Sequence, residues 1–431
     1  MQKPRIFLKT YGCAYNRSDS DAMLAILEAN GYAVAESESG AGVIVLNTCT
    51  VKGVTEQKIL DKAKKLHDAG KRLVLAGCLP EANPGIAGRR APGAVILGTR
   101  AISRIVEAVE AAAGGRRVTI TARKEEKLEL PRAHAGAIAR IPVAEGCLGA
   151  CSYCQTKLAR GRLRSYPMRQ ILCEIARCVE NGAKEIQLTA QDTGAYGMEL
   201  KPKRDLADLL DGITAIPGDF RVRVGMMNPG HAKRILPKLL RAYGSERIYK
   251  FVHLPVQSGS DRVLNSMRRN YSAKDFFSVA AAFRKKFPEI TLATDVIVGY
   301  PSETREDFGK TLRLLGKARP VIVNVSRFAP RPFTPAARMR PLPAAEVKRR
   351  SGEASRLCKA VTKRVLLLQV GRKASVLVTE KRDGGASGRT DSYLPAALPA
   401  SRPGERVEAV VTGATQSCLL CRPAKKASRS S

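Results

Sequence analysis

The stretch IARIPVAEGCLGACSYC, residues 138–154, joins an apolar, strand-like run to three closely spaced cysteines. Cys147, Cys151 and Cys154 follow the spacing C-x3-C-x2-C, and no fourth ligand follows at close spacing. Three thiolates can hold three irons of a cubane iron–sulfur cluster, because cysteine is the usual cluster ligand. The fourth iron then lacks a protein ligand and is open to a small molecule. We call these residues the central triplet.

A structural zinc site is the first alternative for the central triplet. Closed zinc sites take four ligands, usually as two close pairs. The nearby histidine, His134, lies on the N-terminal side in a polar stretch. The second alternative is three buried structural cysteines. The spacing favours a cluster over both alternatives, as a hypothesis that needs structural context.

From about residue 138 onward, strand-like runs alternate with helix-like segments, which predicts a partial (βα)6 barrel. The six runs are IARIPVAEGC, KEIQLTAQD, FRVRVGM, RIYKFVHLPVQSGS, TLATDVIVGYP and PVIVNVSRFAPRP. In such barrels the active site lies at the carboxyl ends of the strands. The central triplet follows the first strand, at that end. Thr304 and Asp307 are spaced like a capping box that begins a helix.

Residues 1–113 show the same alternation, which predicts an open parallel α/β sheet. Cys13, Cys49 and Cys78 each end a strand-like run: RIFLKTYGC, AGVIVLNTC and KRLVLAGC. The carboxyl ends of neighbouring strands line the crevice where ligands bind, so these cysteines are expected to converge on a second cluster. The alternative is three small buried hydrophobic residues. We call them the N-terminal triplet.

The remaining segments are simpler. Residues 114–133 resemble a charged linker between the first domain (1–113) and the barrel (134–368). Residues 369–424 contain short strands separated by turn-rich runs, which predicts a small antiparallel β-barrel. The basic tail, 425–431, is predicted to be disordered. We detect no internal repeat.

Charge is the main global property of the 431-residue chain. Lys and Arg number 74 against 39 acidic residues, a formal net charge of +35. Such a field favours a polyanionic partner and makes binding salt-dependent. The alternative is a merely solvated basic surface. No run is long enough to span a membrane and the N-terminus lacks the features of a signal peptide, so we expect a cytoplasmic protein.

Several polar or glycine positions at the predicted strand ends are candidates for cofactor contacts. A guanidinium matches carboxylate geometry, and a glycine lets the backbone approach a ligand closely. The alternative is that strand-end loops are polar and rich in glycine in any case. The candidates are Tyr153, Gln191, Asp192, Arg223, Gln257, Ser258 and Gly299.

The other cysteines are predicted to be structural. Cys173, Cys178 and Cys358 lie in helix-like segments and are expected in the core. Cys418 and Cys421 are three apart in a strand-like run, where such positions face opposite sides, so joint metal binding is not expected.

Taken together, the motifs resemble those of radical SAM (S-adenosylmethionine) methylthiotransferases over nearly the whole chain. The matching runs are KTYGCAYNRSDSD, VLNTCTV, AGCLP, EGCLGACSYC, LTAQDTGAYG, LPVQSGSDRVLNSMRRNYS, TDVIVGYPSETREDF and RFAPRPFTPAA. The C-terminal segment resembles a TRAM domain, a small RNA-binding β-barrel. The CLLC end and the basic tail are not family features.

The resemblance implies a role for each triplet. The central triplet matches the cysteines that bind the SAM cluster, and the N-terminal triplet matches those of an auxiliary [4Fe-4S] cluster. One SAM is implied to methylate sulfur held at the auxiliary cluster. A second SAM is reductively cleaved to a 5′-deoxyadenosyl radical, which activates an unreactive C–H position. An electron donor and a sulfur donor are implied partners.

The run GCLGACSYCQTKLARGRLRSYP most resembles the archaeal and eukaryotic branch, which acts on N6-threonylcarbamoyladenosine beside the tRNA anticodon. Arg160, Arg162 and Arg164 lie beside the central triplet, where RNA phosphate or the substrate carboxylate could meet them; a solvated basic loop is the alternative. Other substrates left open are isopentenyladenosine in tRNA and a ribosomal protein aspartate. A non-catalytic RNA-binding protein with structural metal is the alternative from another class.

Overall fold

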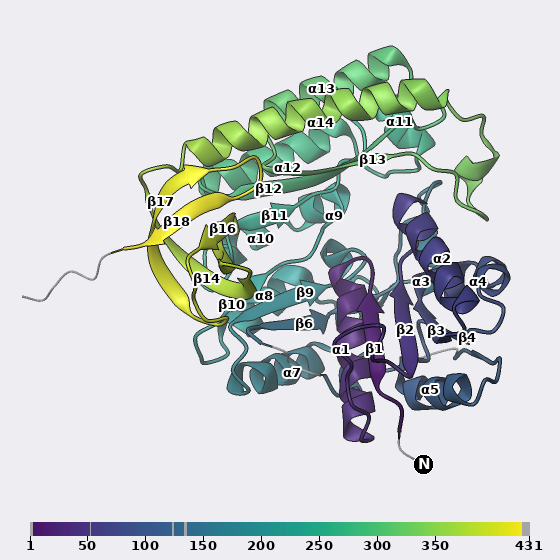
Figure 1. Cartoon of the computed structure of the whole chain (residues 1–431). Helices are drawn as coiled ribbons and strands as arrows, with labels where there is room; N and C mark the ends of the chain where they lie inside the picture. The colour runs from purple at the N-terminus through teal and green to yellow at the C-terminus, as the bar shows by residue number, and fades with distance from the viewer. Residues whose placement is uncertain (1–2, 52, 123–124, 133–135, 425–431) are drawn as a thin grey trace, which may run out of the picture.

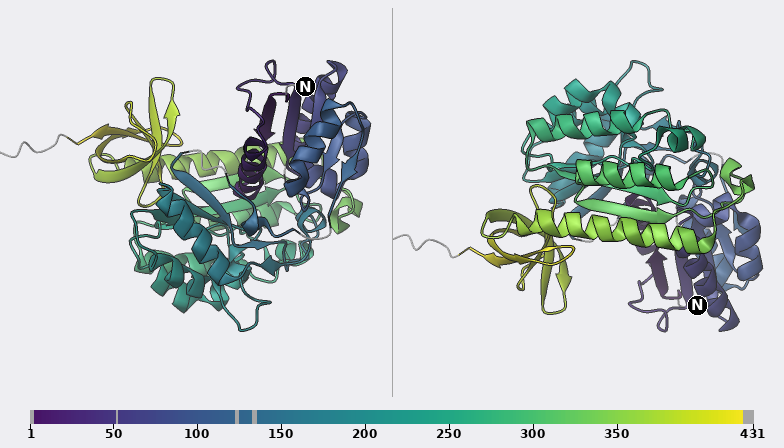
Figure 2. Two further views of the ribbon diagram at one scale, coloured as in Figure 1. Left: turned by 90° about the horizontal axis from the view of Figure 1, so that it is seen from below. Right: turned by 90° about the horizontal axis from the view of Figure 1, so that it is seen from above.

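The computed structural model describes residues 3–51, 53–122, 125–132 and 136–424, and it has three parts arranged in chain order (Figure 1). An N-terminal parallel sheet and a C-terminal closed barrel stand on the same side of a central α/β barrel (Figure 2). His134 and the predicted disordered tail lie outside the described residues. Within those residues, no helix is long and apolar enough to cross a membrane.

The N-terminal part is a five-stranded parallel sheet in the order β1-β2-β3-β4-β5. Alternate residues of its strands pack on opposite faces, as the period of two requires. Val43 and Val45 join the core formed with α1 and α5, whereas Ile44 and Leu46 pack toward α2. The elements are β1 (Ile6–Thr10), α1 (Ala14–Ala29), β2 (Val43–Thr48), α2 (Gly53–Asp68), β3 (Arg72–Gly77), α3 (Cys78–Ala82), α4 (Pro84–Arg90), β4 (Val95–Leu97) and α5 (Ile105–Ala113).

The segment expected to be a charged linker is more structured than the sequence suggested. Its residues Thr119–Ile120 form β5, which pairs in parallel with β4. Lys127, in a short 3-10 helix (Lys127–Glu129), is only 1 % exposed. The expectation was wrong because β5 is two residues long and depends on pairing with β4, while the surrounding charges dominate the local pattern.

The central part confirms the predicted partial barrel. Its six parallel strands lie in two hydrogen-bonded sheets, β10-β9-β6 and β11-β12-β13, and a bridge between Val222 and Ile248 joins β10 to the chain just before β11. The largest apolar core fills the space between these strands and their helices. The strands are β6 (Ile138–Pro142), β9 (Glu185–Thr189), β10 (Arg221–Arg223), β11 (Phe251–His253), β12 (Thr291–Val298) and β13 (Ile322–Arg327).

Helices cover the outer face of the central barrel. The last one leads to the C-terminal barrel. The main ones are α6 (Thr156–Arg160), α7 (Met168–Glu180), α8 (Leu206–Thr214), α9 (Pro229–Arg234), α10 (Leu236–Ala242), α11 (Asp261–Ser266), α12 (Ala273–Lys286), α13 (Arg305–Ala318) and α14 (Ala344–Leu367). The predicted capping box at the start of α13 is present, with Thr304 and Asp307 bonding reciprocally.

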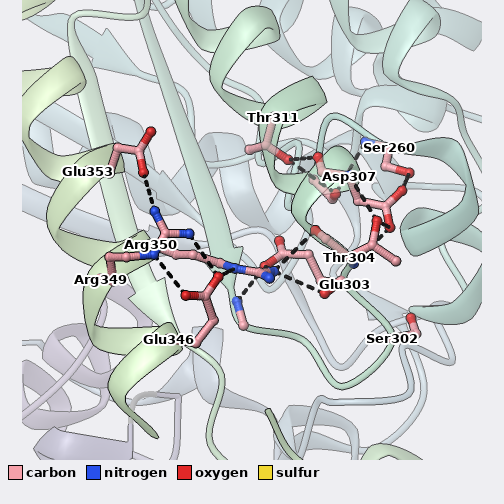
Figure 3. A network of polar contacts seen from close by, with 12 residues as sticks. Ser260, Ser302, Glu303, Thr304, Asp307, Thr311, Glu346, Arg349, Arg350 and Glu353 are labelled. Carbon is pink, nitrogen blue, oxygen red and sulfur yellow. Dashed lines mark hydrogen bonds and ion pairs between the residues drawn. The ribbon is translucent and has the colours of Figure 1, made fainter. Parts of the chain in front are cut away.

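A buried ion pair fixes α14 beside the loop that precedes α13 (Figure 3). Arg350 donates to Glu303 at 2.7 Å, and it also bonds Glu346 on its own helix. Glu303 in turn accepts from the backbone N–H of Gly299 at 2.8 Å. Because Glu303 and Arg350 are both buried, this contact fixes where α14 begins its path across the central barrel.

The C-terminal part is a closed five-stranded barrel in the order β14-β15-β16-β18-β17. Its pairs are antiparallel as predicted, except that β16 and β18 run parallel. Tyr393 anchors it, because its hydroxyl donates to Glu185 at 2.8 Å and its ring packs against Tyr249 and Phe251. The strands are β14 (Lys373–Arg382), β15 (Gly385–Thr390), β16 (Pro395–Leu398), β17 (Arg406–Ala414) and β18 (Leu419–Pro423).

The structural cysteines follow the prediction with one exception. Cys178 and Cys358 are buried, whereas Cys173 is exposed. Five residues along an α-helix turn a side chain by about 140°, so Cys173 and Cys178 do not share a face. Within α7 the buried apolar positions are Ile171, Ile175 and Cys178, on the opposite side from Cys173.

Candidate active site

The central triplet lies in a loop that follows β6 and the short strand β7 (Ala144–Glu145). β7 pairs with β8 (Arg164–Ser165), which closes the loop on itself. Gly146 starts the loop with φ +80°, and an added Cβ there would lie 2.0 Å from the carbonyl oxygen of Arg162. Only glycine fits this conformation without strain. The backbone therefore fixes where the three cysteines begin.

Hydrogen-bond donors surround the sulfurs of the central triplet. The backbone N–H of Gly149 lies 3.3 Å from the Cys147 sulfur, and that of Thr156 lies 3.3 Å from the Cys154 sulfur. The guanidinium of Arg269 donates to the Cys151 sulfur at 3.1 Å. Each sulfur thus has its own donor, which suits thiolates that carry negative charge.

The pKa of Cys147 gives a second sign that the central thiols are close together. Burial raises it to about 11, the Gly149 N–H lowers it, and Asp192, Cys151 and Cys154 raise it further. Three such groups ionise together only when cations compensate their charge, and metal binding that releases thiol protons does this. The donor set therefore fits a bound iron–sulfur cluster.

The structure brings the N-terminal triplet together at the carboxyl ends of β1, β2 and β3. Asn16 Oδ1 accepts hydrogen bonds from both the Cys78 sulfur (3.5 Å) and the Cys13 sulfur (3.9 Å). A Cβ at Gly12 would lie 2.8 Å from the Cys49 sulfur. Burial raises the pKa of Cys49 to about 12, and the thiols of Cys78 and Cys13 raise it as well.

The N-terminal thiols also suit a cluster, with Cys49 and Cys78 buried and Cys13 exposed. Among the described residues, no group of three or more His, Cys, Asp or Glu side chains is placed so that it could hold a single metal ion.

Arg160 connects the two triplets. It ends α6, six residues after Cys154, and donates to the Cys78 sulfur at 3.4 Å. The same guanidinium pairs with Asp19 (2.7 Å) and Glu145 (3.0 Å), and it lies 4.7 Å from the centre of the Tyr15 ring. All of these side chains are buried.

Lys127 completes the charge balance of this network. It pairs with Asp19 at 2.7 Å and with Glu145 at 3.2 Å. Two buried cations thus face two buried carboxylates across the boundary between the N-terminal sheet and the central barrel. Buried charges persist when they are paired and hydrogen-bonded in this way.

Direct packing also joins the loops that carry the triplets. Cys78 and Ala82 of α3 form a small core with Ala159 of α6. Thr50, next to Cys49, donates to the side chain of Gln155, next to Cys154, at 2.5 Å. These contacts place both triplets at one interface.

Gln191 and Asp192 lie at the mouth of the barrel, as the sequence predicted. Gln191 accepts from the Gly146 N–H at 2.6 Å, directly beside the central triplet. Asp192 accepts from the backbone of Asn228 (3.0 Å) and bonds the His231 ring at 2.7 Å. Tyr153 is half-buried and packs at the edge of an apolar group that includes Met267 and Tyr300.

Other predicted contacts have structural partners of their own. The guanidinium of Arg223 lies 5.2 Å from the centre of the Phe251 ring. Arg223 pairs with Gln187 of β9, four residues before Gln191, so Arg223 lies farther along the barrel from the central triplet than Gln191 does. Ser258 is buried and accepts from the Ser260 N–H at 3.2 Å.

Two further candidates make contacts within the protein that their sequence patterns did not indicate. Gln257 has φ +69°, and its backbone carbonyl accepts a hydrogen bond from the backbone N–H of Ile297 at 3.0 Å. At Gly299 a Cβ would collide with Val347 of α14 at 2.6 Å, so packing of a helix, rather than room for a ligand, requires this glycine.

Two of the three arginines proposed to meet RNA are already paired within the protein. Arg160 is buried in the network described above, and Arg164 pairs with Glu126 at 2.6 Å while lying over Tyr166. Arg162 alone is exposed. The expectation fails for Arg160 and Arg164 because their carboxylate partners lie at other positions in the sequence.

Sequence reasoning missed several residues that shape the site: Asn16, Lys127, Glu145, His231 and Arg269. Arg269 lies in the quoted run LPVQSGSDRVLNSMRRNYS, but nothing in that run indicated a contact with Cys151, 118 residues earlier. Asn16 lies three residues after Cys13, and this spacing could have indicated that the two side chains lie close together.

A polar cavity of about 830 Å³ lies between the C-terminal barrel, α1 and the inner face of β6 and β9. Its lining includes four arginines and three carboxylates, beside Gln187 and Tyr393: Arg17, Arg140, Arg382, Arg389, Glu185, Glu380 and Asp383. Such a cavity suits a polar ligand.

Comparisons with known proteins agree with this architecture. The Radical SAM superfamily matches residues 141–315, and the Uncharacterized protein family UPF0004 matches residues 5–98. The radical SAM methyltransferase TsrM from Kitasatospora setae shares the fold with a TM-score of 0.55 at 14 % identity, covering 78 % of this chain and 77 % of its own.

Relatives of much higher identity extend over nearly the whole chain. The probable threonylcarbamoyladenosine tRNA methylthiotransferase of Pyrococcus horikoshii is 42 % identical over 96 % of this chain and 98 % of its own length. That of Archaeoglobus fulgidus is 43 % identical over 90 % and 92 %. The threonylcarbamoyladenosine tRNA methylthiotransferase of Homo sapiens is 37 % identical over 88 % and 66 %. The chain therefore belongs to the radical SAM tRNA methylthiotransferases of the threonylcarbamoyladenosine family.

Proposed function

We propose that this enzyme converts N6-threonylcarbamoyladenosine, beside the tRNA anticodon, to its 2-methylthio derivative with SAM and two [4Fe-4S] clusters. The observation that carries the proposal is the approach of two cysteine triplets at one interface, with Arg160 contacting the Cys78 sulfur from the helix that follows Cys154. A single-cluster enzyme has no need of the second set. The printed names of the relatives support the nucleoside.

In this proposal Cys147, Cys151 and Cys154 hold the SAM cluster, and Cys13, Cys49 and Cys78 hold the auxiliary cluster. When bound, these groups supply electron transfer to SAM and a place for the transferred sulfur.

The chain's own residues position and shield this chemistry. Arg269 and the Gly149 and Thr156 N–H groups stabilise the charge of the central thiolates. Gln191 fixes the start of the loop through Gly146. The contact between Thr50 and Gln155, both buried, closes the interface against water on one side.

We infer that RNA reaches the site through the cavity beside the C-terminal barrel. Arg17, Arg140 and Arg389 line it, and the net charge of +35 favours RNA over a protein substrate. The C-terminal barrel (369–424) is then the RNA-binding part. An electron donor and a sulfur donor complete the reaction, and a cytoplasmic location follows from the tRNA substrate.

Mass spectrometry of tRNA nucleosides after reaction with reconstituted enzyme, SAM and dithionite tests the proposal. We expect threonylcarbamoyladenosine to gain a methylthio group and the anaerobic protein to hold about eight irons, four in each cubane. Appearance of 2-methylthio-isopentenyladenosine instead would change the substrate. No modified nucleoside at all, or about four irons, would overturn the proposal as stated.

A further inference from the structure

Four exposed apolar side chains surround the outer side of the two cysteine triplets. Their exposed fractions are 59 % for Val51, 43 % for Leu148, 44 % for Leu158 and 75 % for Phe333. We call these residues the outer patch. Exposed large apolar groups that gather at one place, rather than scatter, mark interaction sites.

Hydrogen bonds hold the four residues around one hub, formed by Gln155 and Lys157. Val51 follows Thr50, which donates to Gln155, and Phe333 follows Pro332, whose carbonyl accepts from Gln155 at 2.9 Å. Leu158 follows Lys157, whose amine lies 3.4 Å from the carbonyl oxygen of Leu148. The members of the outer patch therefore adjoin one connected set of hydrogen bonds, although they come from three distant segments of the chain.

Phe333 is the most informative member. Its φ is +64°, a conformation that favours glycine and strains a bulky residue. Both neighbouring segments are fixed by buried contacts, since Arg331 pairs with Glu56 at 2.7 Å and Thr334 bonds the Arg331 carbonyl at 2.7 Å. The protein thus holds an aromatic ring in solvent at a backbone position that does not favour one. Strain of this kind clusters at functional sites.

The location of the outer patch separates it from the RNA cavity. The light green segment after β13, which carries Phe333, lies at the end of the molecule farthest from the C-terminal barrel in every view (Figures 1 and 2). Arg338 and Arg340 on this segment are exposed, so cations flank the apolar residues. An apolar centre with a basic margin complements a partner with an acidic margin.

We propose that the outer patch is the docking surface of a small acidic electron-carrier protein that reduces the SAM cluster. The proposal rests on the proposed function. In the step the carrier loses one electron and the cluster gains one, and no covalent bond forms or breaks. Leu148 is next to Cys147 and Val51 is two residues from Cys49, so a carrier seated here is close to both triplets. Small interfaces are typical of such electron-transfer pairs.

Replacement of Phe333 by glycine gives a sharp test, because it removes the ring and relieves the backbone strain at once. We expect Phe333→Gly to fold at least as well as the wild type, judged by thermal unfolding. With photoreduced flavodoxin as the electron source, cleavage of SAM to 5′-deoxyadenosine should need about tenfold more flavodoxin for half-maximal rate, because aromatic anchors dominate interfaces. With dithionite as the source, the rate should not change.

Two further variants complete the design. Arg338→Glu with Arg340→Glu should weaken the flavodoxin reaction most at low salt, where charge attraction is least screened. Leu368→Ser, at a 64 % exposed leucine that follows α14, is the matched control and should have no effect. If Phe333→Gly instead lowers tRNA affinity and leaves flavodoxin kinetics unchanged, the outer patch binds RNA and the proposal is wrong. SAM cleavage without tRNA is measured separately from nucleoside modification, so failure of the proposed function alone leaves this result interpretable.

Discussion

Arg160 joins two cysteine triplets that lie far apart in the sequence, and its bonds explain why a single guanidinium is needed there. From one planar fork it donates to Cys78, Asn16 and Glu145 and forms an ion pair with Asp19. Lysine has the charge but only one nitrogen, so it cannot reach these partners together. Hydrogen bonds and charge near cluster sulfurs set the reduction potential of the cluster. Arg160 therefore has both a structural and an electrostatic role.

Replacement of Arg160 by methionine should expose both roles. Asp19 and Glu145 would keep only Lys127 as a cation, and breaking a buried ion pair costs about 3–5 kcal/mol of unfolding free energy. The auxiliary cluster should become harder to reduce, because a nearby positive charge is lost. Potentiometric titration followed by electron paramagnetic resonance measures this, alongside denaturant unfolding.

Arg269→Met provides the contrast for this experiment. Arg269 contacts Cys151 and lies over Tyr271, so its loss should lower the potential of the SAM cluster only. Arg160→Lys should restore part of the auxiliary potential. Equal shifts of both clusters in both arginine variants would contradict the assignment of one arginine to each triplet.

At the level of helices and strands, the start of α13 directs several hydrogen bonds to one carboxylate, Asp307 (Figure 3). Asp307 accepts from Ser260 at 2.6 Å, from the Thr304 hydroxyl at 2.7 Å and from Arg262. Burial raises its pKa, but the bonds from Arg262, Ser260 and Thr304 outweigh this and hold the pKa below the usual range for aspartate. Ionised Asp307 thus stabilises the folded state.

Asp307→Asn should destabilise the enzyme by about 2 kcal/mol at pH 7, since hydrogen bonds to a charged group are worth about 1.5–3 kcal/mol. The pKa of Asp307 is lower in the folded state than in the unfolded state, where it is about 3.9. The stabilisation is therefore fully present above pH 3.9 and is lost as the pH falls toward and through the folded-state pKa. Thermal unfolding of both proteins between pH 7 and pH 2 measures the effect.

Glu306→Gln is the control for the Asp307 variant. Its carboxylate is exposed and pairs only with Lys310, so little change is expected. A difference between wild type and Asp307→Asn that stays constant down to pH 2 would show that the charge of Asp307 contributes nothing.

The elements themselves were largely predictable, for identifiable reasons. Cys49 and Cys78 follow β2 and β3, whose apolar runs VIVL and LVLA are typical of buried parallel strands. β5 was missed because two residues gain strand geometry only through β4. Cys173 was predicted to be buried, but it lies two residues after the buried Ile171, which places it on the opposite side of α7.

The whole molecule depends on contacts that no local pattern records. Asn16 and Arg160 meet although 144 residues separate them, and this contact exists only once the N-terminal sheet docks on the central barrel. The φ of Phe333 and the cavity beside Tyr393 have the same origin in tertiary packing. The sequence could predict two triplets, therefore, but not the residues that connect them.

The same docking creates the cavity assigned to RNA, which leads to a prediction about salt. Arg17 of α1 and Arg389 of β15 line the cavity from opposite parts of the molecule. Each arginine that neutralises a phosphate releases a condensed counterion, which contributes about 0.7–0.9 to the slope of log affinity against log salt. Arg17→Glu with Arg389→Glu should therefore weaken tRNA binding most at low salt and reduce this slope by about 1.5.

Filter binding at several salt concentrations measures the slope, and the control must carry the same change in charge. Lys285→Glu with Lys286→Glu places two reversals on exposed positions of α12, on the outer face of the central barrel. A general field effect of the +35 chain would make the two double variants equal. Only direct phosphate contacts in the cavity predict that the arginine pair loses more affinity and more slope than the lysine pair. Equal losses would leave the cavity without a role in binding RNA.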